Sequence, residues 1–150
     1  MKVRPAKEEE IQVLLNFEQK LIEFEKPFDP TLKDGNISYY NILSRIKNKD
    51  SLVLVVEYNN EIIGSGFGDI IKAKPFLKHE YFTSLGFFYV KDEYRSKGVN
   101  KLILKELIKW SKKRGVSEII LNVYDENTNA KAVYLKYGFK PNLLEMRMEI

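Results

Sequence analysis

The chain has 150 residues, of which 44% are hydrophobic and 13% aromatic, with a formal net charge of +4 and no cysteine. This length and apolar content predict a single domain over residues 1–150 and argue against disorder. The lack of cysteine excludes disulfides, thiolate metal ligands and a catalytic thiol, and we expect no metal site. Residues 1–10 lack an apolar signal core and no apolar run approaches about 20 residues, so we expect a cytoplasmic protein with no membrane partner.

The charges are spread along the chain, with 25 basic and 21 acidic residues. Basic side chains do cluster at Lys72–Lys78, Arg95–Lys101 and Lys109–Arg114. A nucleic-acid or membrane binder more often shows one concentrated patch, so no nucleic-acid partner is expected. The second cluster differs from the others because of its place between a strand and a helix.

Two helices and a short edge strand are expected in the first 50 residues. Lys2–Arg4 is the candidate strand, and apolar residues at helical spacing predict a helix from about Lys7 to Phe24. Lys26–Gly35 contains two prolines and a glycine, which favour a loop. A weaker helical pattern follows around Ser38–Lys47.

An antiparallel hairpin is predicted next. Ser51–Tyr58 is β-branched and almost continuously apolar, Asn59-Asn60 suits a tight turn, and Glu61–Ile71 should return as the partner strand. Three glycines of the second strand fall at period two and so share one face. These glycines are Gly64, Gly66 and Gly68. They indicate either that another group approaches this face closely or that the strand is bent or bulged there.

A βαβ unit is predicted from residue 81 to residue 124. After the connector Ala73–Glu80, Tyr81–Val90 reads as a strand, Val99–Lys113 as a helix ended by Gly115, and Glu118–Tyr124 as a strand parallel to the first. The remaining elements are a short helix at 127–136 and one or two closing strands at 139–150. These elements together predict an α/β (α+β) fold, a mixed twisted sheet of about six to seven strands with helices on both faces.

The segment Arg95-Ser96-Lys97-Gly98-Val99-Asn100-Lys101 directly follows a strand and opens a helix. The amino end of a helix has free N–H groups and a partial positive charge, so it favours an anion. Glycine allows the backbone to approach a ligand, and the basic side chains add charge. These features suit a pyrophosphate, although the spacing of neither the Walker loop nor the dinucleotide-binding turn is present. A basic helix entry without a ligand is the alternative.

This segment resembles motif A of the GNAT superfamily of N-acetyltransferases, as Arg95-x-x-Gly98-x-Asn100, with asparagine where the family usually has glycine or alanine. The strand Leu85–Val90 and the residues that follow it look like the family's central strand and coenzyme loop. Downstream, Asn127-x-x-Ala130-x-x-x-Tyr134-x-x-x-Gly138-Phe139 resembles its second half-site. The resemblance covers about residues 51–140 and implies two splayed central parallel strands.

The resemblance also implies acetyl-CoA as cosubstrate. Backbone N–H groups from about Lys97 to Lys101 would hold the pyrophosphate, and Phe88–Val90 the pantetheine and the thioester carbonyl. Tyr134 would protonate the departing thiolate, which suits a phenol that is protonated at pH 7. The coenzyme-binding set implied in this way is Phe88, Tyr89, Val90, Arg95, Ser96, Lys97, Gly98, Val99, Asn100, Lys101, Asn127 and Tyr134.

The amine must lose a proton, and no residue stands out as the base. His79 is the one histidine and lies with Glu80 before the central strand, where either side chain is a candidate; Glu25 is another. We expect the amine that accepts the acetyl group to bind on the acceptor side of the site, between residues 20–45 and the basic connector 72–80. That connector mildly disfavours a polycationic acceptor.

The sequence therefore predicts an acetyl-CoA-dependent N-acetyltransferase, an acyltransferase that moves the acetyl group to a primary amine of a small molecule or peptide by direct attack. Two alternatives stay open. One is a protein of the same fold that binds acyl-CoA without catalysis, and the other is a small basic nucleic-acid-binding module. A homodimer is compatible with the sequence, which does not identify the acceptor or the acyl-chain preference.

Overall fold

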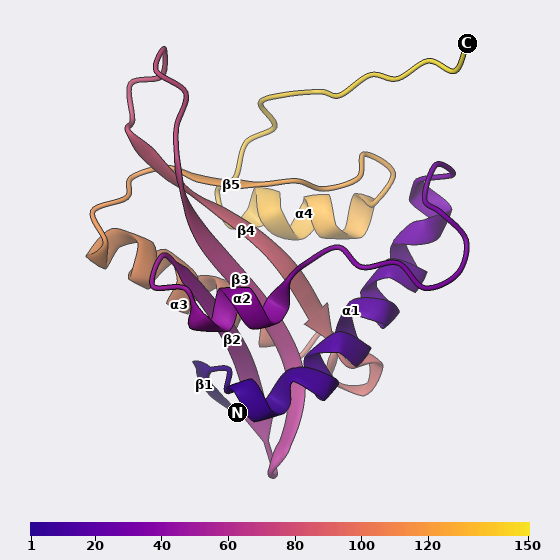
Figure 1. Cartoon of the computed structure of the whole chain (residues 1–150), viewed down its shortest axis with the longest axis vertical. Helices are drawn as coiled ribbons and strands as arrows, with labels where there is room; N and C mark the ends of the chain where they lie inside the picture. Colours follow the sequence, from indigo (N-terminus) through magenta and orange to yellow (C-terminus); the bar gives the residue numbers. More distant parts are fainter.

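A five-stranded mixed sheet forms the centre of the structure, a computed structural model that describes residues 1–150 (Figure 1). The strands lie in chain order: β1 (Lys2–Pro5), β2 (Ser51–Tyr58), β3 (Glu61–Lys72), β4 (Tyr81–Val90) and β5 (Ile119–Leu121). The first four are antiparallel to their neighbours, and β5 runs parallel to β4. The predicted hairpin and βαβ unit are both present.

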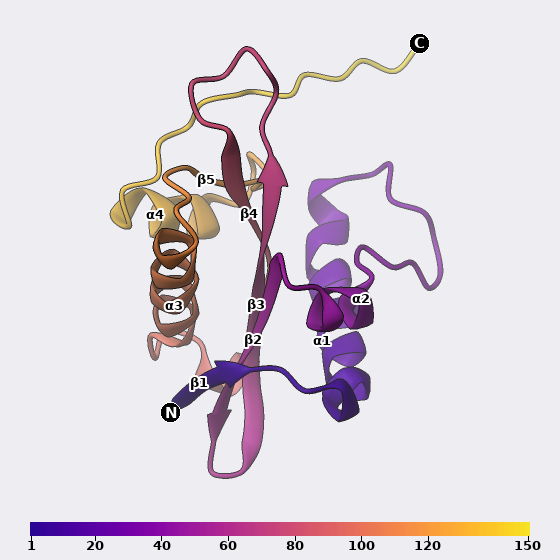
Figure 2. The same ribbon diagram turned by 60° about the vertical axis from the view of Figure 1, so that its left-hand side comes forward.

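Helices cover both faces of this sheet, as predicted. Helices α1 (Ile11–Glu25) and α2 (Ile42–Lys47) lie on one side, and α3 (Val99–Lys113) and α4 (Thr128–Lys136) lie on the other (Figure 2). Short 3-10 turns precede α1 at Glu8–Glu10, follow it at Lys26–Phe28, and follow β4 at Asp92–Tyr94. None of the helices combines the length and the apolar character that crossing a membrane requires.

Each face of the sheet has its own apolar core, and β2 contributes side chains to both because its successive residues point to opposite faces. Val53 and Val55 face α1 and α2, whereas Leu54 and Val56 face α3. Successive strand side chains point to opposite faces, so a strand covered on both sides is continuously apolar. The α1 side also contains Leu14, Phe17, Ile42, Phe67, Phe87 and Tyr89, and the α3 side contains Ile63, Leu85, Val90, Val99, Ile103, Leu104 and Leu107.

Helix α3 packs closely against the face of β3 that carries the glycines. A Cβ atom added to Gly66 would lie 2.7 Å from Cγ2 of Ile103, and one added to Gly64 would lie 2.8 Å from Cγ1 of Val99. Real Cβ contacts essentially never come this close. The two glycines therefore let the helix lie directly on the strand, and this face is filled by packing rather than open to a ligand.

A buried carboxylate delays the start of α2, which begins at Ile42 and not near Ser38. Glu18 in α1 is completely buried and accepts hydrogen bonds from the backbone N–H groups of Tyr39 and Tyr40 at 2.9 and 2.8 Å. These bonds hold the segment before α2 in an extended form against α1. Asn41 then caps the helix, its Oδ1 accepting from the N–H of Ser44 at 3.0 Å.

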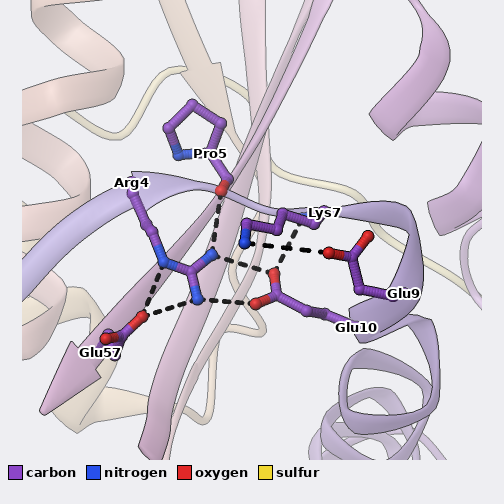
Figure 3. A network of polar contacts seen from close by, with 6 residues as sticks. All are labelled: Arg4, Pro5, Lys7, Glu9, Glu10 and Glu57. Atoms are coloured by element: carbon purple, nitrogen blue, oxygen red, sulfur yellow. Dashed lines mark hydrogen bonds and ion pairs between the residues drawn. The ribbon is translucent and has the colours of Figure 1, made fainter. Parts of the chain in front are cut away.

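An ion-pair network fixes the amino end of α1 to the edge of the sheet (Figure 3). The guanidinium of Arg4 in β1 donates to both carboxylate oxygens of Glu10, at 3.0 and 2.6 Å, and to Glu57 in β2 at 2.8 Å. Glu10 also accepts from the backbone N–H of Lys7 at 2.8 Å. The hydrogen bond from Arg4 lowers the pKa of Glu10, so the carboxylate stays charged and bound at neutral pH.

The expected count of six to seven strands is wrong, because the segment Phe139–Ile150 pairs with no strand. Its alternating apolar residues favour a strand, but pairing needs a neighbour, and β5 has only three residues. Figure 1 shows the end of the chain running away from the sheet. Arg147 instead donates to Asp29 and to the hydroxyl of Thr31, both at 2.9 Å.

Candidate functional site

The parallel strands β4 and β5 separate after a short stretch of pairing. Thr83, Ser84 and Leu85 pair with Ile119–Leu121, and no pairing continues beyond them. The last part of β4, residues 86–90, therefore lacks a strand neighbour on its β5 side. We call this separation of β4 and β5 the splay. The family resemblance implies it, and it leaves backbone groups of β4 free to bind another partner.

A β-bulge lies at the point where the strands part. Ser65 faces Tyr89 and Phe67 faces Gly86, so Gly66 stands opposite two residues of β4. Phe87 carries the bulge with a φ of 59°, a left-handed conformation that is strained for a large side chain. The hydroxyl of Ser65 donates to the carbonyl oxygen of Phe87 at 3.3 Å. The bulge leaves one extra residue of β4 unpaired, and it bends the strand at the point where β4 and β5 separate.

The loop between β4 and α3 presents a row of unbonded amides. Ser96 and Gly98 have positive φ values of 62° and 82°. None of the six backbone N–H groups from Ser96 to Lys101 donates to a protein acceptor, and the first bond of the helix runs from Leu102 to Gly98 at 3.2 Å. Left-handed residues in such a turn gather N–H groups into a concave anion site. A Cβ on Gly98 would meet nothing within 4 Å, so the space beside this backbone is open.

The side chains of this loop are exposed and partly held by neighbours. Arg95 pairs with Asp92 at 2.7 Å, and its guanidinium lies 5.6 Å from the ring centroid of Phe24 at the end of α1. Lys97 lies over the ring of Tyr94 at 5.3 Å. Asn100 is exposed and bonds to no protein group. The loop thus combines free amides with positive side chains, and Arg95 links it to α1.

Helix α4 places Tyr134 against the splayed part of β4. The ring of Tyr134 lies 6.2 Å from that of Phe88 and 5.8 Å from that of Phe139, edge to face in both cases. Burial, followed by the negative charge of Glu25, raises the pKa of Tyr134 to about 12, so the phenol is protonated at neutral pH. Asn127 caps this helix, its Oδ1 accepting from the N–H of Ala130 at 3.2 Å.

His79 and Glu80 are not brought to this splay. Both lie in the loop joining β3 to β4, before the first residue of β4, whereas the amide row follows its last residue. The ten residues of β4 span about 30 Å at about 3.3 Å per residue. The ring of His79 lies instead 6.4 Å from that of Phe82.

Glu25, at the carboxyl end of α1, lies beside two tyrosines from distant parts of the chain. The hydroxyl of Tyr39 is buried with no partner in good hydrogen-bond geometry; this burial raises its pKa, and the Glu25 carboxylate and the Tyr124 hydroxyl are near enough to raise it further. Burial raises the pKa of Glu25, and no lysine or arginine pairs with it. Sequence reasoning missed Tyr124, because nothing in a strand pattern indicates that it meets a helix about 100 residues earlier.

Solved structures share this arrangement over nearly the whole chain. A mutant of the BH1408 protein from Bacillus halodurans has a TM-score of 0.90 and 21% identity, covering 100% of this chain and 99% of that one. A predicted acetyltransferase from Clostridium acetobutylicum, crystallised with acetyl-CoA, has a TM-score of 0.75 and 22% identity over 97% and 95%. An aminoglycoside 6'-N-acetyltransferase from Acinetobacter haemolyticus has a TM-score of 0.73 and 16% identity over 100% and 99%. At these identities the likeness concerns the fold.

A curated relative gives a shorter match. An uncharacterized N-acetyltransferase of Schizosaccharomyces pombe is 33% identical over an alignment of 72 residues that covers 41% of this chain and 44% of that protein. The match therefore spans less than half of the relative's length. The sequence pattern of the acetyltransferase (GNAT) family matches residues 16–139. Because that match covers most of the chain, including the loop, the splay and α4, the protein belongs to the GNAT family of acetyltransferases.

Proposed function

We propose that this protein transfers the acetyl group of acetyl-CoA to a primary amine. The observation that carries the proposal is the row of six free backbone amides from Ser96 to Lys101 at the start of α3. A pyrophosphate offers several anionic oxygens, and such a row can bind them without any change in the protein. Lys97, Lys101 and the open space beside Gly98 suit a large anionic ligand at this position.

The pantetheine arm would extend from this loop along the splayed edge of β4. In the segment Phe88–Val90, the backbone groups that point away from β3 have no strand neighbour and are available to an amide-bearing ligand. The carbonyl oxygen of Val90 already accepts from Nε of Arg95 at 3.4 Å. The thioester would then reach the bulge at Phe87. Preorganised donors at a developing oxyanion are usually the largest contribution to catalysis of acyl transfer.

The reaction would be a direct attack of the amine nitrogen on the thioester carbon. The new C–N bond forms, the C–S bond breaks, and the thiolate of CoA takes the proton of the Tyr134 hydroxyl. The amine gives up one proton, for which Glu25 is placed better than His79 or Glu80. Glu25 acts on the pKa of Tyr134 through its charge, so the two groups lie within electrostatic reach. The phenolate formed on Tyr134 is reprotonated from solvent after each turnover.

Thiol release from acetyl-CoA with a panel of primary amines tests this function. The proposal requires amine-dependent release of CoA and a product heavier than the amine by one acetyl group. Binding of acetyl-CoA without turnover of any amine would favour an acyl-CoA-binding protein that has lost catalysis. Binding of a DNA duplex without binding of acetyl-CoA would favour the nucleic-acid module.

A further inference from the structure

The carboxylate of Glu25 is an unpaired charge in a partly desolvated place. No basic side chain lies within ion-pair distance of it, and burial raises its pKa above the usual value. A buried carboxylate without a cation is destabilising unless something else supplies the charge. Carboxylates with a perturbed pKa cluster at functional sites.

A second polar group at the same place also lacks a partner. The hydroxyl oxygen of Tyr39 is buried and has no partner in good hydrogen-bond geometry; this burial raises its pKa, and the carboxylate of Glu25 and the hydroxyl of Tyr124 are near enough to raise it further. Its backbone is held in place by the bond from its N–H to the buried Glu18 at 2.9 Å. The unsatisfied hydroxyl is therefore fixed in position rather than free to turn to water.

Asp29, an acid that the Tyr124 hydroxyl also reaches, is already paired with a cation. Asp29 accepts from the hydroxyl of Thr31 at 2.6 Å and from the guanidinium of Arg147 at 2.9 Å, and these bonds lower its pKa to about 2. Tyr124 also donates to it, at 3.4 Å. The ion pair compensates Asp29 and backbone N–H groups satisfy the buried Glu18, whereas Glu25 has no basic partner.

Aromatic rings form the surroundings of this charge. Phe24, Phe28 and Tyr124 follow one another with ring centroids 5.7 and 6.0 Å apart. The guanidinium of Arg95, the residue just before the amide row, lies 5.6 Å from the ring centroid of Phe24, so these rings reach toward the coenzyme loop. A flat apolar group would contact these rings, and their faces would also attract a cation.

We propose that the acceptor is a monoamine with a flat apolar body, whose ammonium is bound by the carboxylate of Glu25 and the hydroxyls of Tyr39 and Tyr124. This inference rests on the proposed function, since it names the acceptor of the same reaction. One free carboxylate matches one positive charge, and the rings match an aromatic or planar apolar body. Polycationic acceptors such as aminoglycosides would bring charges for which this site has no partner.

A substrate panel with acetyl-CoA tests the selectivity. The probes are 2-phenylethylamine, the polyamine spermidine and the aminoglycoside kanamycin, each followed by thiol release. We expect kcat/KM to be at least about 10-fold higher for 2-phenylethylamine than for either polycation, because an unpaired ligand charge is penalised. Equal or higher values for the polycations, or no turnover of 2-phenylethylamine while acetyl-CoA binds, would overturn the inference.

The variant Glu25→Gln separates binding of the ammonium from binding of the donor. Loss of a charged partner should weaken 2-phenylethylamine by about 10- to 100-fold, measured as KM and as heat of binding to the CoA complex. The dissociation constant of acetyl-CoA should stay unchanged. Glu23→Gln, an exposed acid on the same helix, is the matched control and should behave as the parent protein. Unchanged amine binding in Glu25→Gln would refute the assignment.

The variant Tyr39→Phe gives a second signature that a structural role alone would not produce. Removing a buried unpartnered hydroxyl should raise the melting temperature, yet it should weaken amine binding by about 3- to 10-fold. Unweakened amine binding would remove Tyr39 from the ammonium site. Failure of acetyl-CoA to bind the parent protein would instead count against the proposed function, so the two failures are distinguishable.

Discussion

The ring of Tyr134 in α4 lies 6.2 Å from the ring of Phe88 in β4, edge to face. This contact places the tyrosine of a short helix at the part of β4 that β5 no longer covers. The ring also packs against Phe139, so its position depends on apolar contacts and not on a hydrogen bond of its hydroxyl. The hydroxyl is therefore free for chemistry, and its removal should leave the packing intact.

Tyr134→Phe should lower kcat by about 100-fold or more, the usual contribution of a positioned general acid. The melting temperature and the dissociation constant of acetyl-CoA should remain those of the parent protein. Steady-state thiol release and calorimetry measure both quantities. A kcat equal to that of the parent would show that the thiolate leaves without help from this phenol.

Gly98→Ala should weaken acetyl-CoA binding, because the new methyl group enters the open space beside the amide row. Its φ of 82° also adds strain of about 1–2 kcal/mol to the folded state. Gly115→Ala is a matched control at the other end of α3, with a φ of 73° and equally open space. We expect both variants to lose similar stability and only Gly98→Ala to lose coenzyme affinity. Equal affinity in the two variants would contradict the placement of the pyrophosphate.

Gly66→Ala should destabilise the fold by about 1–3 kcal/mol, the usual range for overpacking. The new Cβ would lie 2.7 Å from Cγ2 of Ile103, so α3 must move away from β3. Ile103→Ala removes that atom, and in the double variant part of the Gly66→Ala effect should disappear. Chemical denaturation of the four proteins measures this coupling. Strict additivity would show that the helix tolerates the added methyl group.

Glu25→Gln should raise the melting temperature of the ligand-free protein at neutral pH. Burial raises the pKa of Glu25 in the folded state, so the folded protein binds more protons than the unfolded chain above the ordinary carboxyl pKa of 4.5. The stability contributed by Glu25 is thus complete below pH 4.5 and is lost as the pH rises through the raised value. The groups facing this carboxylate are Tyr39, Tyr40, Tyr124 and Tyr134, all neutral in this range.

Melting curves of both proteins from pH 4 to pH 8 measure the effect. The gain from Glu25→Gln should be small at pH 4 and should grow toward pH 8. A constant difference across this range would show that Glu25 titrates normally in the folded protein.

Arg147→Met should shift acceptor selectivity toward dications. Arg147 donates to Asp29 at 2.9 Å, and Asp29 keeps its charge because Thr31 also binds it. Without the guanidinium, a second negative charge becomes available near Glu25. We expect kcat/KM for spermidine to rise relative to 2-phenylethylamine by about 3- to 10-fold. An unchanged ratio would mean that Asp29 does not face the acceptor.

Local features of the sequence predict most of the architecture. The hairpin, α3 and the loop before α3 could be predicted because each depends on residues close together in the chain. The signals are the turn at Asn59-Asn60, the helical spacing of apolar residues in 99–113 and the glycine at position 98. The resemblance to the acetyltransferase family predicts the splay of β4 and β5. Elements whose form depends on a distant partner are harder to predict.

Three features show this limit. The glycines of β3 indicate a close approach, but only the folded chain shows that α3 makes it. The alternation in residues 139–150 predicts a strand, whereas Arg147 draws that segment to Asp29. Glu25 and Tyr124 are separated by most of the chain, and no period or spacing relates them. The acceptor side of the site therefore depends on contacts that one sequence cannot display.

Thermal unfolding with and without acetyl-CoA, with ATP and NAD as control ligands, measures directly whether the protein binds the coenzyme. A ligand at 100 times its dissociation constant adds about 2.7 kcal/mol of stability, which corresponds to a rise of several degrees in melting temperature for a chain of this size. We expect such a rise with acetyl-CoA and a much smaller one with either control. An unchanged melting temperature at millimolar acetyl-CoA would contradict the assignment of the Ser96–Lys101 amides to the coenzyme.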